Sequence, residues 1–134
     1  MAVLERLKEK IVEAVSHFER DQMSIIPESI SINFHPRSLM VSLMGNLSPA
    51  EKSYARDARG SRLLEKFYRE LFNAAKPVLE KEVAGILGRS AQRCSLSIDP
   101  ESGGMVILFS FSDDLPPREI QGESGPVQLK GKES

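Results

Sequence analysis

The sequence predicts an α+β domain in the order α-β-β-α-β-β, with a four-stranded, mainly antiparallel sheet and helices packed on one face. Two observations support this prediction. Two long segments repeat apolar residues every three or four positions, as amphipathic helices do. Two pairs of short segments alternate apolar and polar residues, as half-buried strands do. The length of 134 residues suits one domain.

The first helix is predicted over residues 3–20, and a loop over residues 21–28. Charged residues occupy the helix face opposite to its apolar stripe. The stripe consists of Leu4, Leu7, Ile11, Val15 and Phe18.

A hairpin is predicted next, from a strand at 29–35, a turn at 35–38 and a return strand at 39–45. In the return strand, Leu39, Val41 and Leu43 share one face, and Met40 and Met44 lie on the other. The first strand alternates in the same way, so one face of the hairpin is predicted to be buried.

A helix start follows at Ser48, which can cap the helix, with Pro49 in the first helical position. Glu51 stands three residues after Ser48 and completes a capping box. The short helix is expected to end near residue 57, and Gly60 is expected to mark a break or bend.

The main helix is predicted over about residues 61–87. Gly88 suits its C-terminal end, and Pro77 is expected to kink it because the proline ring clashes with the preceding turn. Its predicted buried stripe is Leu64, Phe67, Leu71, Ala75, Val78, Val83 and Ile86.

A second hairpin is predicted from residues 92–99 and 105–112. After it the chain is rich in proline, glycine, serine and charge and has no periodicity. We therefore expect one domain over residues 1–112 and a disordered tail over 113–134.

Composition limits the function classes. Net charge is −1, there is no tryptophan, and aromatic residues make up 6%, so nucleic-acid binding is not expected. One cysteine fits a reducing compartment, and no apolar run is long enough for a signal peptide or a span. We expect a cytoplasmic protein without direct membrane insertion.

Catalysis is not indicated. His17 and His35 have no cysteine, second histidine or carboxylate at metal-ligand spacing. Cys94 takes an inward strand position, where cysteine usually serves as a small apolar residue. Gly103 belongs to a hairpin turn, since no helix follows it as a phosphate-binding loop requires. No enzyme, cofactor or metal site is expected.

A basic stripe is the sharpest local pattern. Its residues recur at helical spacing and could bind phosphates, lipid headgroups or an acidic partner. Alternatively they form a solvated face, because acidic residues are interspersed among them. The stripe consists of Lys52, Arg56, Arg59, Arg62, Lys66 and Arg69.

A second pattern is apolar. The return strands of both hairpins carry large apolar side chains on the face opposite to the core, where a solvated sheet is normally polar. We predict that they form a homodimer interface; the alternative is that one helix covers each side of the sheet. These residues are Met40, Met44, Val106 and Leu108.

The run LSPAEK at 47–52, the bend at Gly60, the long helix with Lys76 and Pro77, and the hairpin after Gly88 resemble the MpsC family. The likeness covers about residues 3–112 and is strongest over 46–88. The family is named for a sodium-translocating, membrane-potential-generating system of bacteria.

The resemblance implies a cytoplasmic accessory or regulatory protein beside a cation or inorganic-carbon transport system, which it would join through a protein partner. It implies no catalytic residues. The alternative function is a ligand-sensing module that binds an anionic metabolite or nucleotide on the sheet and the basic helix.

Overall fold

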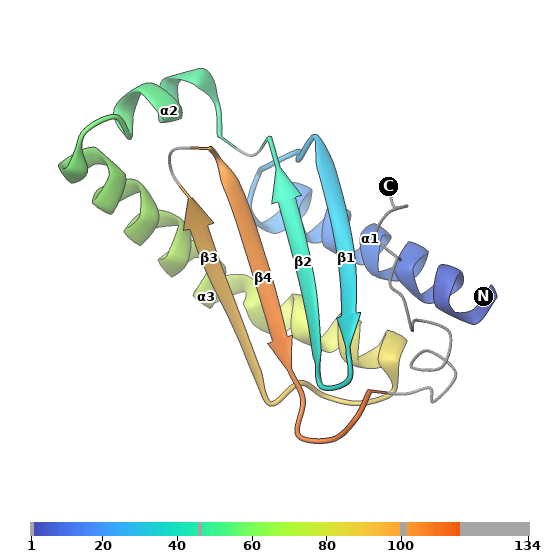
Figure 1. Ribbon diagram of the computed structural model, residues 1–134. Coiled ribbons are helices and arrows are strands. Elements are labelled where there is room, and N and C mark those ends of the chain that lie inside the picture. The colour runs from blue at the N-terminus through green and yellow to red at the C-terminus, as the bar shows by residue number, and fades with distance from the viewer. Residues whose placement is uncertain (1, 46, 100–101, 116–134) are drawn as a thin grey trace.

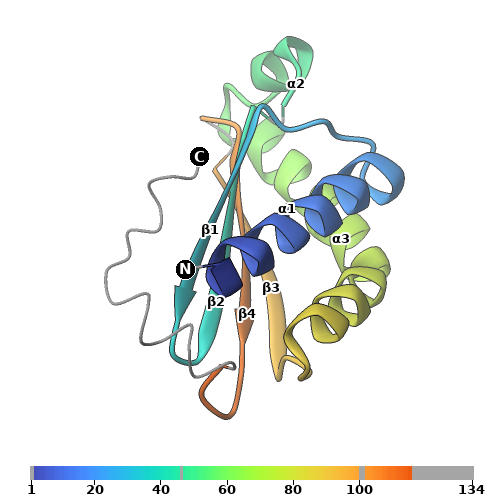
Figure 2. The ribbon, with the colours of Figure 1, turned by 90° about the vertical axis from the view of Figure 1, so that its right-hand side faces the viewer.

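The computed structural model describes residues 2–45, 47–99 and 102–115 (Figure 1). Its elements are α1 (Ala2–Gln22), β1 (Ser29–His35), β2 (Ser38–Met44), α2 (Pro49–Tyr54), α3 (Ala58–Leu87), β3 (Arg93–Asp99) and β4 (Gly104–Ser110). The strands form one antiparallel sheet in the order β1-β2-β4-β3. Figure 2 shows α1 and α3 together on one face of this sheet. The predicted element order and fold class are confirmed.

The core lies between the sheet and the two long helices. Inward positions of the strands alternate with polar ones, as the period-two pattern predicts. From α1 and α3, Phe18 and Phe72 meet edge to face with ring centroids 5.9 Å apart. The fully buried inward strand residues include Leu39, Val41, Leu43, Ile107 and Phe109.

The predicted break at Gly60 is wrong, because Gly60 lies in the first turn of α3. The two helices separate earlier, at residues 55–57, where Asp57 caps α3. The Gly60 amide donates to Asp57 Oδ1 at 2.7 Å. A Cβ atom on Gly60 would lie 1.9 Å from the carbonyl oxygen of Tyr54. Glycine is therefore needed because the backbone of α2 passes close to α3.

Replacing Gly60 with alanine is expected to lower the free energy of unfolding by about 1–3 kcal/mol, since the methyl group forces α2 away from α3. Urea unfolding measures this change. Gly85→Ala is the matched control: it lies in the same helix, a Cβ there has no neighbour within 4 Å, and alanine is the better helix former by about 1 kcal/mol. Equal effects of the two substitutions would contradict the close approach.

The buried stripe of α3 differs in phase from the prediction. Phe67 and Val78 are 54% and 47% exposed, whereas Tyr68, Phe72 and Leu79 are buried. Apolar residues occupy adjacent rows of this helix, so helical periodicity alone allows both phases. Contact with α1, as in the Phe18–Phe72 pair, determines which of these two helix faces is buried.

The C-terminal end of α3 follows the prediction. The helix ends at Gly88, which adopts the left-handed conformation with φ 76°. It continues through Pro77 as one element, and the kink expected at Pro77 stays a prediction. Glycine takes this conformation without the strain that a side chain brings. The Gly88 amide donates to the carbonyl of Ala84 at 2.8 Å and closes the last turn.

The segment after β4 packs against the first hairpin. Phe111 and Leu115 are buried at 4% and 2% exposure. The Phe111 amide donates to the carbonyl of Arg37, and the Leu115 amide donates to that of Pro36. Leu115, which the prediction placed in the tail, is therefore packed against the first hairpin. The remainder of the predicted tail, 116–134, lies outside the described residues.

Candidate interaction surfaces

The face of the sheet opposite to the helices carries the predicted apolar residues in its centre. Strand pairing sets Met40 beside Leu108 and Ser42 beside Val106 across β2 and β4. The edge strands contribute small polar side chains to the same rows: Ser31, Asn33, Ser95 and Ser97. The two central strands thus carry four large apolar side chains, with Ser42 among them, between two polar margins.

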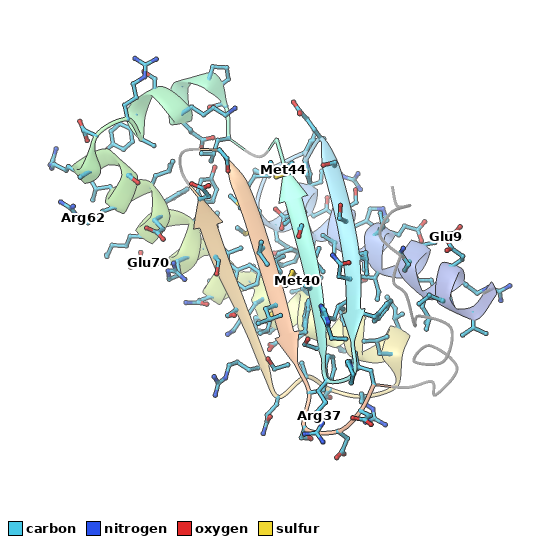
Figure 3. All side chains as sticks on the ribbon, viewed as in Figure 1. Glu9, Arg37, Met40, Met44, Arg62 and Glu70 are labelled. Carbon is cyan, nitrogen blue, oxygen red and sulfur yellow. The ribbon has the colours of Figure 1, made fainter. Side chains whose placement is uncertain are left out.

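We call Met40, Met44, Val106 and Leu108 the open face. Figure 3 shows Met40 and Met44 on the side of the sheet that faces away from α1 and α3. Met44 is 46% exposed, and the other three are half-buried. The alternative in which one helix covers each side of the sheet is not found among the described elements. The homodimer itself stays a prediction.

The basic stripe does not form one helical face, because the junction at 55–57 interrupts its phase. Lys52 and Arg56 line a shallow hollow of about 680 Å³, and the carboxylates of Asp57 and Asp99 line it too. The other four cations lie on α3 and do not line this hollow. The six residues therefore do not converge on one anion pocket in the described part of the chain.

Two cations of the stripe form ion pairs along α3. Lys66 pairs with Glu70 at 2.9 Å, and Arg69 pairs with Glu65 at 3.3 Å. By contrast, the exposed side chains of Arg56, Arg59 and Arg62 make no hydrogen bond or ion pair within residues 2–45, 47–99 and 102–115. Within the stripe, ion pairs thus partly neutralise Lys66 and Arg69 but not Arg56, Arg59 and Arg62 in the described part of the chain.

Basic residues of α3 also cover the edge of the sheet at β3. Arg69 Nη1 donates to the carbonyl of Leu96 at 2.8 Å, and Lys76 Nζ donates to that of Cys94 at 3.0 Å. Edge strands expose backbone groups that invite pairing with another chain, and these donors occupy two of the carbonyls. No local spacing in the sequence reveals this role.

A buried carboxylate lies where α1 meets α3. Glu19 is 1% exposed, and its Oε1 has no hydrogen-bond partner within the described residues. Burial raises the pKa of Glu19 from 4.5 to about 7. The sequence held a signal for it: Glu19 follows Val15 by four residues and so continues the apolar stripe of the first helix.

Tyr68 of α3 lies near Glu19 and forms a hydrogen bond with α2. The Tyr68 hydroxyl donates to Glu51 Oε2 at 2.5 Å. Burial, this hydrogen bond and the charges of Glu51 and Glu19 raise the pKa of Tyr68. Glu51 also closes the predicted capping box with Ser48, which is confirmed.

The candidate catalytic residues stay separate. Cys94 is buried, and burial together with the charge of Glu80 raises the pKa of its thiol to about 12, so thiolate is scarce at neutral pH. His17 and His35 are exposed on different elements. Within the described ranges, no group of three or more histidine, cysteine, aspartate or glutamate side chains could hold a metal ion.

Comparison with protein families places most of the chain in a known family. Residues 4–113 match the family described as the Na+-translocating membrane potential-generating system (MpsC). No curated protein and no solved structure matches the chain. None of the helices described here has the length and apolar character to cross a membrane. Since the match spans most of the 134 residues, the chain belongs to the MpsC family.

Proposed function

We propose that this protein is a non-enzymatic accessory or regulatory component of a bacterial membrane system that transports cations or inorganic carbon. It acts from the cytoplasm through protein–protein contact. Family membership supports the link to a Na+-translocating system. The single observation that favours contact as the mechanism is the open face, because a sheet face in water is normally polar.

A second copy of the chain is the occupant that we propose for the open face. The margins of this face carry the short side chains of Ser31, Ser95 and Ser97, which let another sheet approach to about 10 Å. A two-fold axis would bring eight large apolar side chains together. Burying each one fully contributes about 1.5–3 kcal/mol, so even partial burial offsets much of the entropy cost of association.

Replacing Met44 and Leu108 together with aspartate is expected to convert a dimer into a folded monomer, because the charges would be buried at the interface. Light scattering measures the mass, and circular dichroism checks the fold. Val78→Asp is the matched control, since Val78 is 47% exposed but lies on α3, behind the sheet. A monomeric wild type, or a double variant that stays dimeric, would contradict the proposal.

A further inference from the structure

The end of the molecule formed by α2 and the start of α3 projects past the sheet (Figure 1). It exposes three large apolar side chains: Tyr54 at 52%, Leu63 at 41% and Phe67 at 54%. The same segment carries Arg56, Arg59 and Arg62, whose side chains form no ion pair with another described residue. We call Tyr54, Arg56, Arg59, Arg62, Leu63 and Phe67 the α2–α3 corner.

Helical spacing sets the apolar and basic residues of α3 side by side. Leu63 and Phe67 are four residues apart and therefore adjacent on the helix surface. Arg62 and Lys66 form the neighbouring row, and Arg59 precedes Leu63 by one turn. The ring of Phe67 packs against that of Tyr68 in an edge arrangement with centroids 5.1 Å apart. This contact orients Phe67 while half of its surface stays exposed.

The acidic groups near the corner already have partners. Glu65 and Glu70 pair with Arg69 and Lys66. Asp57 accepts the Gly60 amide, and Glu51 accepts the Tyr68 hydroxyl. The positive charge of Arg56, Arg59 and Arg62 is therefore not neutralised by an ion pair with these carboxylates.

We infer that the α2–α3 corner docks on the anionic surface of a lipid bilayer. Leu63 and Phe67 enter the headgroup layer, and the arginines contact the lipid phosphates, as basic and apolar side chains do in interfacial helices. A flat surface suits this corner because the apolar pair stands on a projecting helix end. A peptide helix is usually bound in a groove, and neither Leu63 nor Phe67 lines the hollow beside α2.

Sedimentation with lipid vesicles tests this inference, which goes beyond the proposed accessory function and does not depend on the open face. The full chain is expected to bind vesicles that contain phosphatidylserine, and not vesicles of phosphatidylcholine alone. Added salt is expected to weaken binding, because it screens the arginines. Arg59→Ala and Arg62→Ala are each expected to weaken binding about fivefold. The pair Leu63→Ser and Phe67→Ser is expected to weaken it at least about tenfold.

Two variants of α1 serve as controls. Val3 is 42% exposed and Lys10 is exposed, and the N-terminal half of α1 lies at the opposite end of the molecule (Figure 1). Val3→Ser and Lys10→Ala are expected to bind vesicles as the wild type does. Circular dichroism checks that every variant is folded.

Three results would overturn the inference. Equal binding to neutral and anionic vesicles would remove the role of charge. Displacement by inorganic phosphate at constant ionic strength would indicate a soluble anion as the ligand. Failure to bind anionic vesicles would exclude a lipid surface and leave an acidic protein segment as the occupant of the corner.

Discussion

Replacing Glu19 with glutamine is expected to raise the free energy of unfolding by about 3 kcal/mol at a pH well above 7. Glu19 is 1% exposed and its Oε1 lacks a hydrogen-bond partner among the described residues. Burial raises its pKa from 4.5 to about 7. The ionised carboxylate therefore destabilises the folded state. Glutamine removes the charge and has nearly the same volume.

The raised pKa of Glu19 determines how stability depends on pH. Between pH 4.5 and about 7 the folded protein holds a proton on Glu19 that the unfolded chain has released. The contribution of Glu19 to stability therefore falls as pH rises through this window and stays low above it. In Glu19→Gln this loss is expected to disappear.

Urea unfolding at several pH values measures both effects. A buried amide carries its own cost, but that cost does not change with pH, so the flattened pH profile is the decisive readout. Glu13→Gln, at an exposed position of the same helix, is expected to leave the profile unchanged. A Glu19→Gln profile that still falls between pH 4.5 and about 7 would show that another group causes the dependence.

Replacing Leu115 with alanine is expected to lower the free energy of unfolding by about 2–5 kcal/mol, the range for leucine in a packed core. Leu115 is 2% exposed and belongs to the main core cluster. Its segment is held on the first hairpin by the backbone hydrogen bonds to Pro36 and Arg37. Arg89 Nη1 also donates to the carbonyl of Asp114 at 2.8 Å.

Thermal or urea unfolding measures this loss. Ile26→Ala is the matched control, since Ile26 is also a large aliphatic residue but is 78% exposed. It is expected to change stability by no more than about 0.5 kcal/mol. If Leu115→Ala and Ile26→Ala were equally mild, the segment after β4 would not dock in solution.

Local patterns account for most of the predicted fold. The alternation in both hairpins depends on neighbouring residues alone, and the strands observed at Ser29–His35 and Arg93–Asp99 follow it closely. The capping box at Ser48 and the left-handed Gly88 are also local, because each depends on a few backbone groups at a helix end. The composition of the open face was likewise readable from strand periodicity.

Three features escaped prediction because they depend on segments far apart in the chain. The phase of α3 is set by contact with α1, as in the Phe18–Phe72 pair. Whether the basic side chains share one face depends on where α2 ends. Whether they are available depends on distant groups such as the carbonyl of Leu96, which accepts a hydrogen bond from Arg69. The docking of Leu115 depends on the first hairpin, whose turn supplies the carbonyl of Pro36.

The sequence by itself determined which segments form helices and strands and which strand faces are apolar, because periodicity and caps act over a few residues. Tertiary structure alone decided that β4 lies beside β2, so that Met40 and Leu108 become neighbours. It also decided that Glu19 is buried with no hydrogen-bond partner for its Oε1 among the described residues, while Leu63 and Phe67 stay exposed. Burial is a property of packed elements, and periodicity ranks helix faces without stating which neighbour covers them.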